Sequence, residues 1–382
     1  MPKGGYDPRR GGQRQAAVMV IIFSREAGVN RAVRIPIGCT VALWLTLLGV
    51  SAACAGPVRT ESGTISSIAP RESMAVVKMA ARSGPMTKPV FPPSPSTALP
   101  DMPWDRHTRT VVGTLRRHVV SGRETLLDIA RAYDLGFNEM EDLYPGMDPW
   151  LPPVGAVLTI PSRWVLPEST RSEVVVNVAE LRLYRFRQEA DATTVETFPV
   201  GIGDLDWPTP TGQFRIHTKV RHPAWVIPAS LRTKYGRTVI PPGPDNPLGD
   251  YWMRLGGTSY GIHGTDLPWS VGRLVTHGCI RLYPEDIAYL FHSLVLPAGV
   301  RLIYEPVKIG LADGRVYVEA HRDVYGRIAD FRAYGFQRLA ASKWRHSVDR
   351  EAFARALEDR SGLPVDVTAG ALDRPARDRS PK

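Results

Sequence analysis

The chain has 382 residues, enough for two domains with connecting segments, and with 43% hydrophobic and 23% charged residues it has the composition of a globular protein. The formal net charge is +10, but the first 55 residues hold seven of the basic and two of the acidic residues, so the remaining 41 Lys/Arg and 36 Asp/Glu leave +5. No block of consecutive Lys/Arg accompanies this mild excess, which argues against a nucleic-acid-binding protein.

The N-terminal 55 residues have the pattern of an export signal. Arg31 and Arg34 precede the apolar run 41–50, and small residues follow at 51–56. The apolar run is short for a membrane span, and Ala53-Cys54-Ala55 fits a cleavage site. We therefore expect residues 1–55 to direct the protein to the periplasm. Lipidation of Cys54, which would anchor the protein to a membrane, is the alternative.

Residues 56–114 are predicted to be an extended linker because they contain Pro and Ser without periodicity.

Residues 115–165 have the pattern of a small strand-helix-helix-strand unit. Alternation predicts strands over 116–120 and 156–160, and helical spacing predicts helices over 126–133 and 137–144. Ser121 and Glu124 are spaced as a capping box, and Gly136 is expected to end the first helix. The stretches His118–Ala130 and Gly155–Pro161 resemble the LysM module, which implies binding of glycan strands that contain N-acetylglucosamine. A purely structural role is the alternative.

Residues 171–306 are rich in β-branched and aromatic residues separated by Gly and Pro, and only 284–296 has the pattern of a sizeable helix. This residue pattern predicts a mainly β, sandwich-like domain with a small helical insert. Beyond it, a hairpin turning at 312–314 and a helix capped by Asp349 predict a C-terminal extension over 307–368. Residues 369–382 are expected to be a disordered tail.

Cysteine usage singles out Cys279. The other two cysteines, Cys39 and Cys54, lie in the export segment, so an exported protein would carry one thiol without a disulfide partner. His263 lies sixteen positions before Cys279 and His277 two before. Since an imidazole can accept a thiol proton, either histidine is a candidate partner for a cysteine nucleophile.

The residues around Cys279 suit acyl transfer. Backbone N–H groups of Gly278 and Cys279 are candidates for stabilising an oxyanion. Arg281 can hold a carboxylate, or alternatively pair with Glu285 or Asp286. A zinc site built on the two histidines and Cys279 is a weaker interpretation, because no fourth ligand is evident. We expect no metal and no cofactor.

The pattern His263…Thr276-His277-Gly278-Cys279-Ile280-Arg281 resembles the active-site signature of the L,D-transpeptidase (YkuD-type) family. The resemblance implies that Cys279 attacks the bond between the L- and D-centres of a peptidoglycan tetrapeptide stem. D-Alanine leaves, a thioester forms, and an amine acceptor on another stem or on an envelope protein resolves it.

Carried over from the family, His263 is the base and His277 and Thr276 orient the site. Arg281 grips a carboxylate of the stem, and Ser270 and Trp269 line the entrance. The alternative is a non-catalytic protein that binds the cell wall through its LysM-like module.

Overall fold

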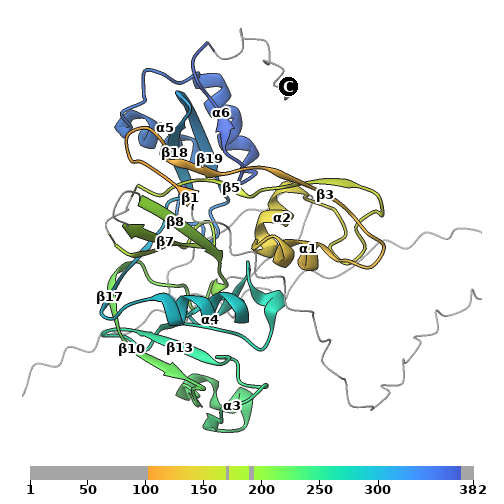
Figure 1. Cartoon of the computed structure of the whole chain (residues 1–382), viewed down its shortest axis with the longest axis vertical. Helices are drawn as coiled ribbons and strands as arrows, with labels where there is room; N and C mark the ends of the chain where they lie inside the picture. The colour runs from red at the N-terminus through yellow and green to blue at the C-terminus, as the bar shows by residue number, and fades with distance from the viewer. Residues whose placement is uncertain (1–101, 169–171, 189–192, 371–382) are drawn as a thin grey trace, which may run out of the picture. The chain divides into compact units, whose positions relative to one another are not determined.

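The computed structural model describes residues 102–168, 172–188 and 193–370 (Figure 1). The predicted export signal and most of the predicted tail lie outside these residues. Across the described ranges, the helices are all too short or too polar to cross a bilayer.

The centre of the fold is a nine-stranded mixed sheet, and the predicted mainly β class is confirmed. Its pairs are antiparallel except β6 with β17 and β14 with β16, which are parallel. In spatial order the strands are β1 (Met102–Pro103), β8 (Thr193–Pro199), β7 (Arg182–Gln188), β6 (Val174–Asn177), β17 (Ala298–Ile303), β10 (Gly212–Arg221), β13 (Tyr251–Leu255), β14 (Gly261–His263) and β16 (Ile280–Arg281).

The sheet separates two apolar cores because successive side chains of a strand point to opposite faces. On β6, Val174 and Val176 belong to one core and Val175 to the other. The first core is covered by α4 (Pro284–Ser293), through Ile287 and Leu290. This helix is the predicted 284–296 helix, ending three residues early.

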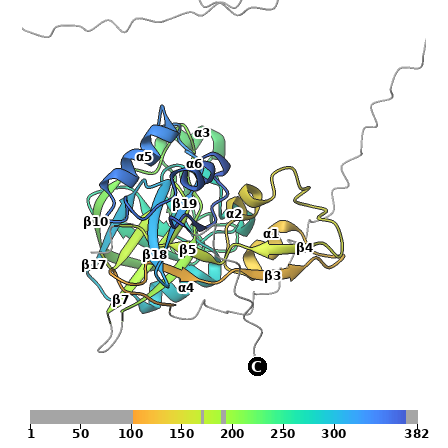
Figure 2. The same ribbon diagram turned by 90° about the horizontal axis from the view of Figure 1, so that it is seen from above.

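The second core is covered by the predicted strand-helix-helix-strand unit. Strand β3 (Arg116–Val119) pairs with β4 (Val157–Ile160), and α1 (Leu126–Ala132) and α2 (Phe137–Leu143), here called the helical pair, lie between them in sequence (Figure 2). The capping box is formed by Thr125 and Asp128, so the Ser121–Glu124 prediction was wrong by one turn. Gly136 begins α2 instead of ending α1.

The predicted linker 56–114 extends too far. Strand β1 pairs with β8, and β2 (Val111–Gly113) pairs with β5 (Arg163–Val165). The first strands of the fold therefore lie within the predicted linker, where main-chain pairing satisfies their backbone groups. The rest of the predicted linker lies outside the described residues.

The strand-helix-helix-strand unit over residues 115–165, here called the N-terminal unit, shares one continuous core with the sheet. Leu126, Ile129 and Met140 of the helical pair are buried in the same cluster as Tyr184 and Val195 of the sheet. Since buried apolar side chains contribute roughly 1.5–3 kcal/mol each, this contact stabilises both parts.

The C-terminal extension consists of the predicted hairpin and helix, with additional elements. These are β18 (Val307–Ala312), β19 (Arg315–Ala320), α5 (Phe331–Ala341), α6 (Arg350–Asp359) and β20 (Val365–Asp366). Asp349 caps α6 as predicted. Helix α5 was missed because Gly335 lies at its centre. There, an added Cβ would approach Leu357 Cδ1 of α6 to 2.4 Å, so the glycine permits close helix packing.

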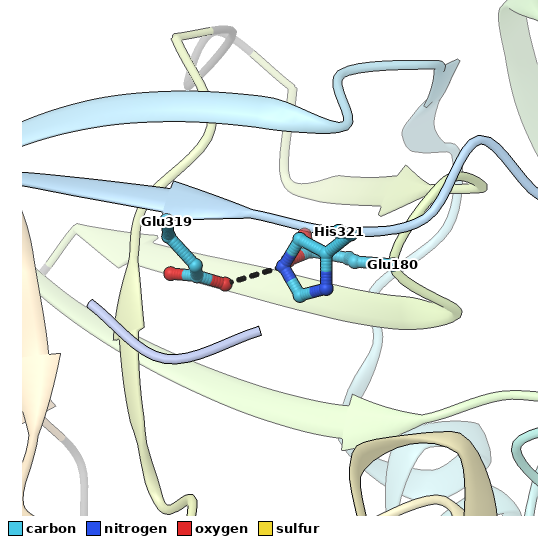
Figure 3. Close-up of side chains that lie close together, drawn as sticks. All are labelled: Glu180, Glu319 and His321. Carbon is cyan, nitrogen blue, oxygen red and sulfur yellow. Dashed lines mark hydrogen bonds and ion pairs between the residues drawn. The ribbon is translucent and has the colours of Figure 1, made fainter. Parts of the chain in front are cut away.

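A buried ionic cluster joins the C-terminal extension to the part of the chain that forms the nine-stranded sheet, here called the sheet domain (Figure 3). The ammonium of Lys308 contacts the carboxylates of Glu180 and Glu319, and His321 Nε2 lies 2.7 Å from Glu319 and 3.3 Å from Glu180. Two carboxylates and a histidine at such spacing resemble a metal site. Here, however, the Lys308 ammonium supplies the positive charge, and the tyrosine hydroxyl of Tyr184 accepts a further hydrogen bond from it at 3.0 Å.

Candidate active site

Cys279 lies between β15 (Leu274–Thr276) and β16, directly beside the strand that carries His263. Strands β14 and β16 run parallel, with Ile262 opposite Ile280 and His263 opposite Arg281. A cavity of about 560 Å³ opens at this edge of the sheet. Its lining includes five of the predicted site residues: His263, Thr276, His277, Cys279 and Arg281.

The outer wall of this cavity comes from a segment that the sequence analysis did not identify. Residues 223–235 contain β11 (Trp225–Val226), a 3₁₀ helix (Ala229–Leu231) and α3 (Arg232–Tyr235), and β11 pairs with β12 (Val239–Ile240). The rings of Trp225 and Tyr235 meet edge to face, with centroids 5.1 Å apart. In the sequence, these two aromatic residues within a Pro-rich loop could have indicated that the segment lines a binding cavity.

Burial shifts the pKa values of the cysteine thiol and of the upstream histidine toward their neutral forms. Burial raises the pKa of Cys279 to about 11, although a hydrogen bond to the Gly261 backbone and the charge of Arg281 oppose it. Burial, helped by Arg281, lowers the pKa of His263 to about 3 against hydrogen bonds to the backbone of Gly264 and Leu248. Burial therefore opposes charge on both groups.

The two histidines occupy different surroundings. His263 is buried, its Nδ1 lies 2.6 Å from the Gly264 carbonyl oxygen, and its ring stacks on Trp252 at 5.6 Å between centroids. A carbonyl only accepts, so Nδ1 carries the proton and Nε2 keeps its lone pair. His277 is only partly buried and lies against Trp207, with ring centroids 5.9 Å apart.

The turn that presents Cys279 depends on glycine. Gly278 has φ +94°, and a Cβ there would lie 2.4 Å from the Tyr260 ring. The turn is held by two hydroxyls: Thr276 Oγ1 donates to the Cys279 carbonyl at 2.6 Å, and Thr209 Oγ1 donates to the Gly278 carbonyl at 3.2 Å. Thr209 is itself fixed by Tyr325 of the C-terminal extension, whose hydroxyl accepts from its backbone N–H at 3.0 Å.

Arg281 points into the cavity without a carboxylate partner of the predicted kind. Its Nη1 donates to Ser270 Oγ at 3.0 Å, and its Nε has no hydrogen-bond partner among the described residues. The alternative pairing of Arg281 with Glu285 or Asp286 was wrong. Glu285 binds Arg131 through two hydrogen bonds of 2.8 Å, and Asp286 shares a hydrogen bond with Asp134.

Ser270 and Trp269 do not line the cavity that contains Cys279, so their predicted place at its entrance was wrong. Both belong to a 3₁₀ helix (Pro268–Ser270). Ser270 is buried beneath Arg281, whereas Trp269 borders a separate hollow against Asp128 and Arg131 of α1.

The cavity is positively charged. Lys234, Arg254 and Arg281 are among its lining residues, and none of the described lining residues is Asp or Glu. Burial lowers the pKa of the Arg281 guanidinium, with Asp266 opposing, yet an arginine stays charged in proteins. Such a lining favours an anionic ligand.

Comparison with known proteins agrees with this geometry. Residues 171–309 match the family model of the L,D-transpeptidase catalytic domain, YkuD. The chain is 36% identical to "Probable L,D-transpeptidase ErfK/SrfK" of Salmonella typhimurium, over 65% of this chain and 84% of that protein. It is 35% identical to "Probable L,D-transpeptidase YcfS" of Escherichia coli, over 67% and 85%, and 34% identical to "Probable L,D-transpeptidase YbiS" of Escherichia coli, over 62% and 81%. The chain therefore belongs to the L,D-transpeptidase family with a YkuD-type catalytic domain.

Proposed function

We propose that this protein is a periplasmic peptidoglycan L,D-transpeptidase that acts through Cys279 on tetrapeptide stems. The observation that carries the proposal is the convergence of a thiol, a buried imidazole and a guanidinium in one cationic cavity. A carboxylate-bearing peptide fits this charge, and a thiol nucleophile fits acyl transfer. A zinc site or a non-catalytic wall-binding protein does not require this arrangement.

In the proposed reaction, the Cys279 thiol loses its proton to His263 as its sulfur attacks the carbonyl of the L-to-D bond. The free Nε2 lone pair of His263 suits it to accept this proton. The resulting imidazolium donates the proton to the nitrogen of the departing D-alanine, and a thioester remains. An amine acceptor then attacks the thioester, His263 takes up its proton, and the thiol is restored.

The oxyanion formed in each step requires hydrogen-bond donors. Backbone N–H groups of Gly278 and Cys279 are the candidates, because the turn at Gly278 brings the backbone to the sulfur without an intervening side chain. Thr276 and Thr209 hold this turn through its carbonyl groups. His277 is proposed to orient the site from its contact with Trp207.

The test is to incubate the protein with soluble tetrapeptide muropeptides and to identify products by mass spectrometry. Wild-type protein should release D-alanine and join the stem to an amine, and the mass of the product identifies the acceptor. Cys279→Ala should give no product while keeping the circular dichroism spectrum of the wild type. Turnover by Cys279→Ala at the wild-type rate would disprove the mechanism.

A second proposed activity is glycan binding by the unit at 115–165. It is supported by large apolar side chains that are exposed on its surface, which a sugar face can cover. They are Val119 (61% exposed), Trp150 (61%), Leu151 (77%), Val154 (72%) and Val157 (59%).

Because this unit shares a core with the sheet, the test is Trp150→Ser and not a deletion. The variant should sediment less with insoluble peptidoglycan and keep full activity on soluble stems; unchanged sedimentation would favour a structural role.

A further inference from the structure

The loop 267–273, which leads from His263 toward Cys279, rests against the helical pair. The Phe137 amide at the start of α2 donates to the Val271 carbonyl at 3.3 Å. The guanidinium of Arg273 lies 4.0 Å from the centroid of the Phe137 ring. The loop and the first turn of α2 are therefore in direct contact through both backbone and side chain.

The tightest point of this contact is between two glycines. A Cβ on Gly136 would lie 2.9 Å from Gly272 Cα, and a Cβ on Gly272, which has φ +79°, would lie 2.2 Å from the Phe137 nitrogen. Because no side chain separates the two backbones, any displacement of α2 is passed directly to the loop.

The same loop carries the hydroxyl that holds Arg281. Ser270 Oγ accepts from Arg281 Nη1 at 3.0 Å and donates to the Leu267 carbonyl. The backbone of Arg281 is fixed separately, by hydrogen bonds of 2.8 and 2.9 Å with Gly201. Ser270 therefore sets the direction of the guanidinium and not the position of its strand.

The helical pair also holds the chain that follows Arg281. Arg131 of α1 binds Glu285 through two hydrogen bonds, and the Tyr283 hydroxyl donates to the Leu135 carbonyl at 3.0 Å. Both segments that flank Arg281 thus rest on the same two helices. Fixed geometry of this kind is what binding sites need from their supporting residues.

We propose that Ser270 is a positioning residue for Arg281 and that the Gly136–Gly272 contact makes the helical pair part of the carboxylate-binding site. The N-terminal unit then determines how tightly the cavity binds the stem, apart from any glycan that it binds itself. The inference rests on the proposed function, since it assumes that Arg281 holds a stem carboxylate.

The test compares two soluble tetrapeptide stems, one with a free side-chain carboxylate on its diamino acid and one with that carboxylate amidated. Wild-type protein should have the lower KM for the free carboxylate. Ser270→Ala removes one hydrogen bond to a charged group, so its KM for this stem should rise about fivefold, with kcat and the amidated-stem KM within about twofold of wild type.

Gly136→Ala tests the same inference from the other side of the contact. Its added Cβ would lie 2.5 Å from Asn138 Oδ1 and 2.9 Å from Gly272 Cα, so α2 and the loop must move apart. The variant should give the same selective rise in KM while remaining folded in thermal unfolding. Gly299→Ala is the matched control, because a Cβ at Gly299 meets nothing within 4 Å, and its kinetics should equal those of wild type.

The inference is overturned if wild type does not distinguish the two stems. It is also overturned if folded Ser270→Ala or Gly136→Ala changes both stems equally, or changes neither. A wild-type protein that releases no D-alanine from either stem would instead refute the proposed function, so the two failures are distinguishable.

Discussion

Lys308 and Arg281 are both cations withdrawn from water, but their surroundings differ. Lys308 is 1% exposed and lies between two carboxylates and a tyrosine hydroxyl. Arg281 has one serine hydroxyl at Nη1 and an Nε without a partner among the described residues. The first cation has two carboxylates in direct contact, whereas the second has the carboxylate of Asp266 in its surroundings and lies at a cavity whose described lining has no acid.

This difference separates a structural charge from a binding charge. A buried ion must be paired to persist, and the pair fixes the parts that carry its members, here the extension and the sheet domain. A cation left short of partners at a cavity gains its remaining interactions from a ligand. Substitution of Lys308 should therefore act mainly on stability, and substitution of Arg281 should act mainly on activity.

Removing His263 should have the largest effect on activity. His263→Ala removes the proposed base, so kcat should fall about a hundred- to ten-thousand-fold, the range typical of general-base loss. His277→Ala should cost less, because His277 is only partly buried and does not carry the Nδ1–carbonyl bond. Steady-state kinetics on both folded variants decides between them, and a greater loss in His277→Ala would reverse the assignment.

Removing Lys308 should act on stability instead. Lys308→Met leaves the two buried carboxylates of Glu180 and Glu319 with His321 as their one remaining cationic partner, and breaking a buried ion pair in this way typically costs about 3–5 kcal/mol. Urea unfolding at neutral pH measures this cost. Arg315→Met is the control, since its ion pair with Asp366 is at the surface and its loss should change stability little. An equal, small effect of both variants would contradict the assignment of Lys308 as a structural charge.

Arg281→Met should show the opposite behaviour to Lys308→Met. The guanidinium interacts with the carboxylate of Asp266 where Lys308 contacts two carboxylates, so the unfolding free energy should fall less than in Lys308→Met. The KM for stems with a free carboxylate should rise about tenfold or more, because a charge-assisted pair is lost. A folding defect as large as that of Lys308→Met would remove the distinction between the two regions.

The ionic cluster should also make stability depend on pH. Burial opposes the charged form of His321, but hydrogen bonds to Glu180 and Glu319 raise its pKa from 6.5 to about 9. This contribution is complete below about pH 6.5 and is lost as the pH rises to 9. Burial likewise opposes the charge on Glu180, yet Lys308 and His321 lower its pKa from 4.5 to about 2, so its contribution is lost as the pH falls from 4.5 to 2.

In unfolding free energies measured from pH 3 to 9, the contribution of this cluster should therefore be greatest between about pH 5 and 6.5. The decline toward pH 9 should be absent in His321→Gln, and a decline that persists in this variant must come from other groups.

The smallest expected effect is that of His263→Ala on the alkylation rate of the Cys279 thiol. With a Cys279 pKa of about 11, its alkylation rate should rise about tenfold per pH unit from pH 6 to 9, without a plateau. His263→Ala should leave this profile unchanged, because His263 is already neutral in that range. A plateau below pH 8 would show a stabilised thiolate.

Much of this molecule was predictable from its sequence where local pattern decides. The period-two strands of the sheet, the helical pair and the cap at Asp349 all follow from residue type and spacing, and His263 and Cys279 line the same cavity. The helix around Gly335 did not follow, because its glycine is justified only by a partner twenty-two residues away, Leu357.

The sequence was also a poor guide to which residues face the cavity. Ser270 and Trp269 lie close to Cys279 along the chain, but the 3₁₀ helix turns one beneath Arg281 and the other toward α1. Conversely, Trp225 and Tyr235 lie far from Cys279 in sequence and reach the cavity through long-range folding. Side-chain direction in irregular segments depends on tertiary contacts that spacing does not encode.

The core shared by the N-terminal unit and the sheet limits how this chain can be divided. The family match begins at residue 171, yet Val175, Tyr184 and Val195 bury their side chains against residues that precede that point. A catalytic piece cut at 171 would expose this apolar face to water and tend to aggregate. Recombination that exchanged the N-terminal unit for an unrelated module would meet the same obstacle. A stable catalytic fragment of this protein should therefore include the N-terminal unit as well as residues 171–309.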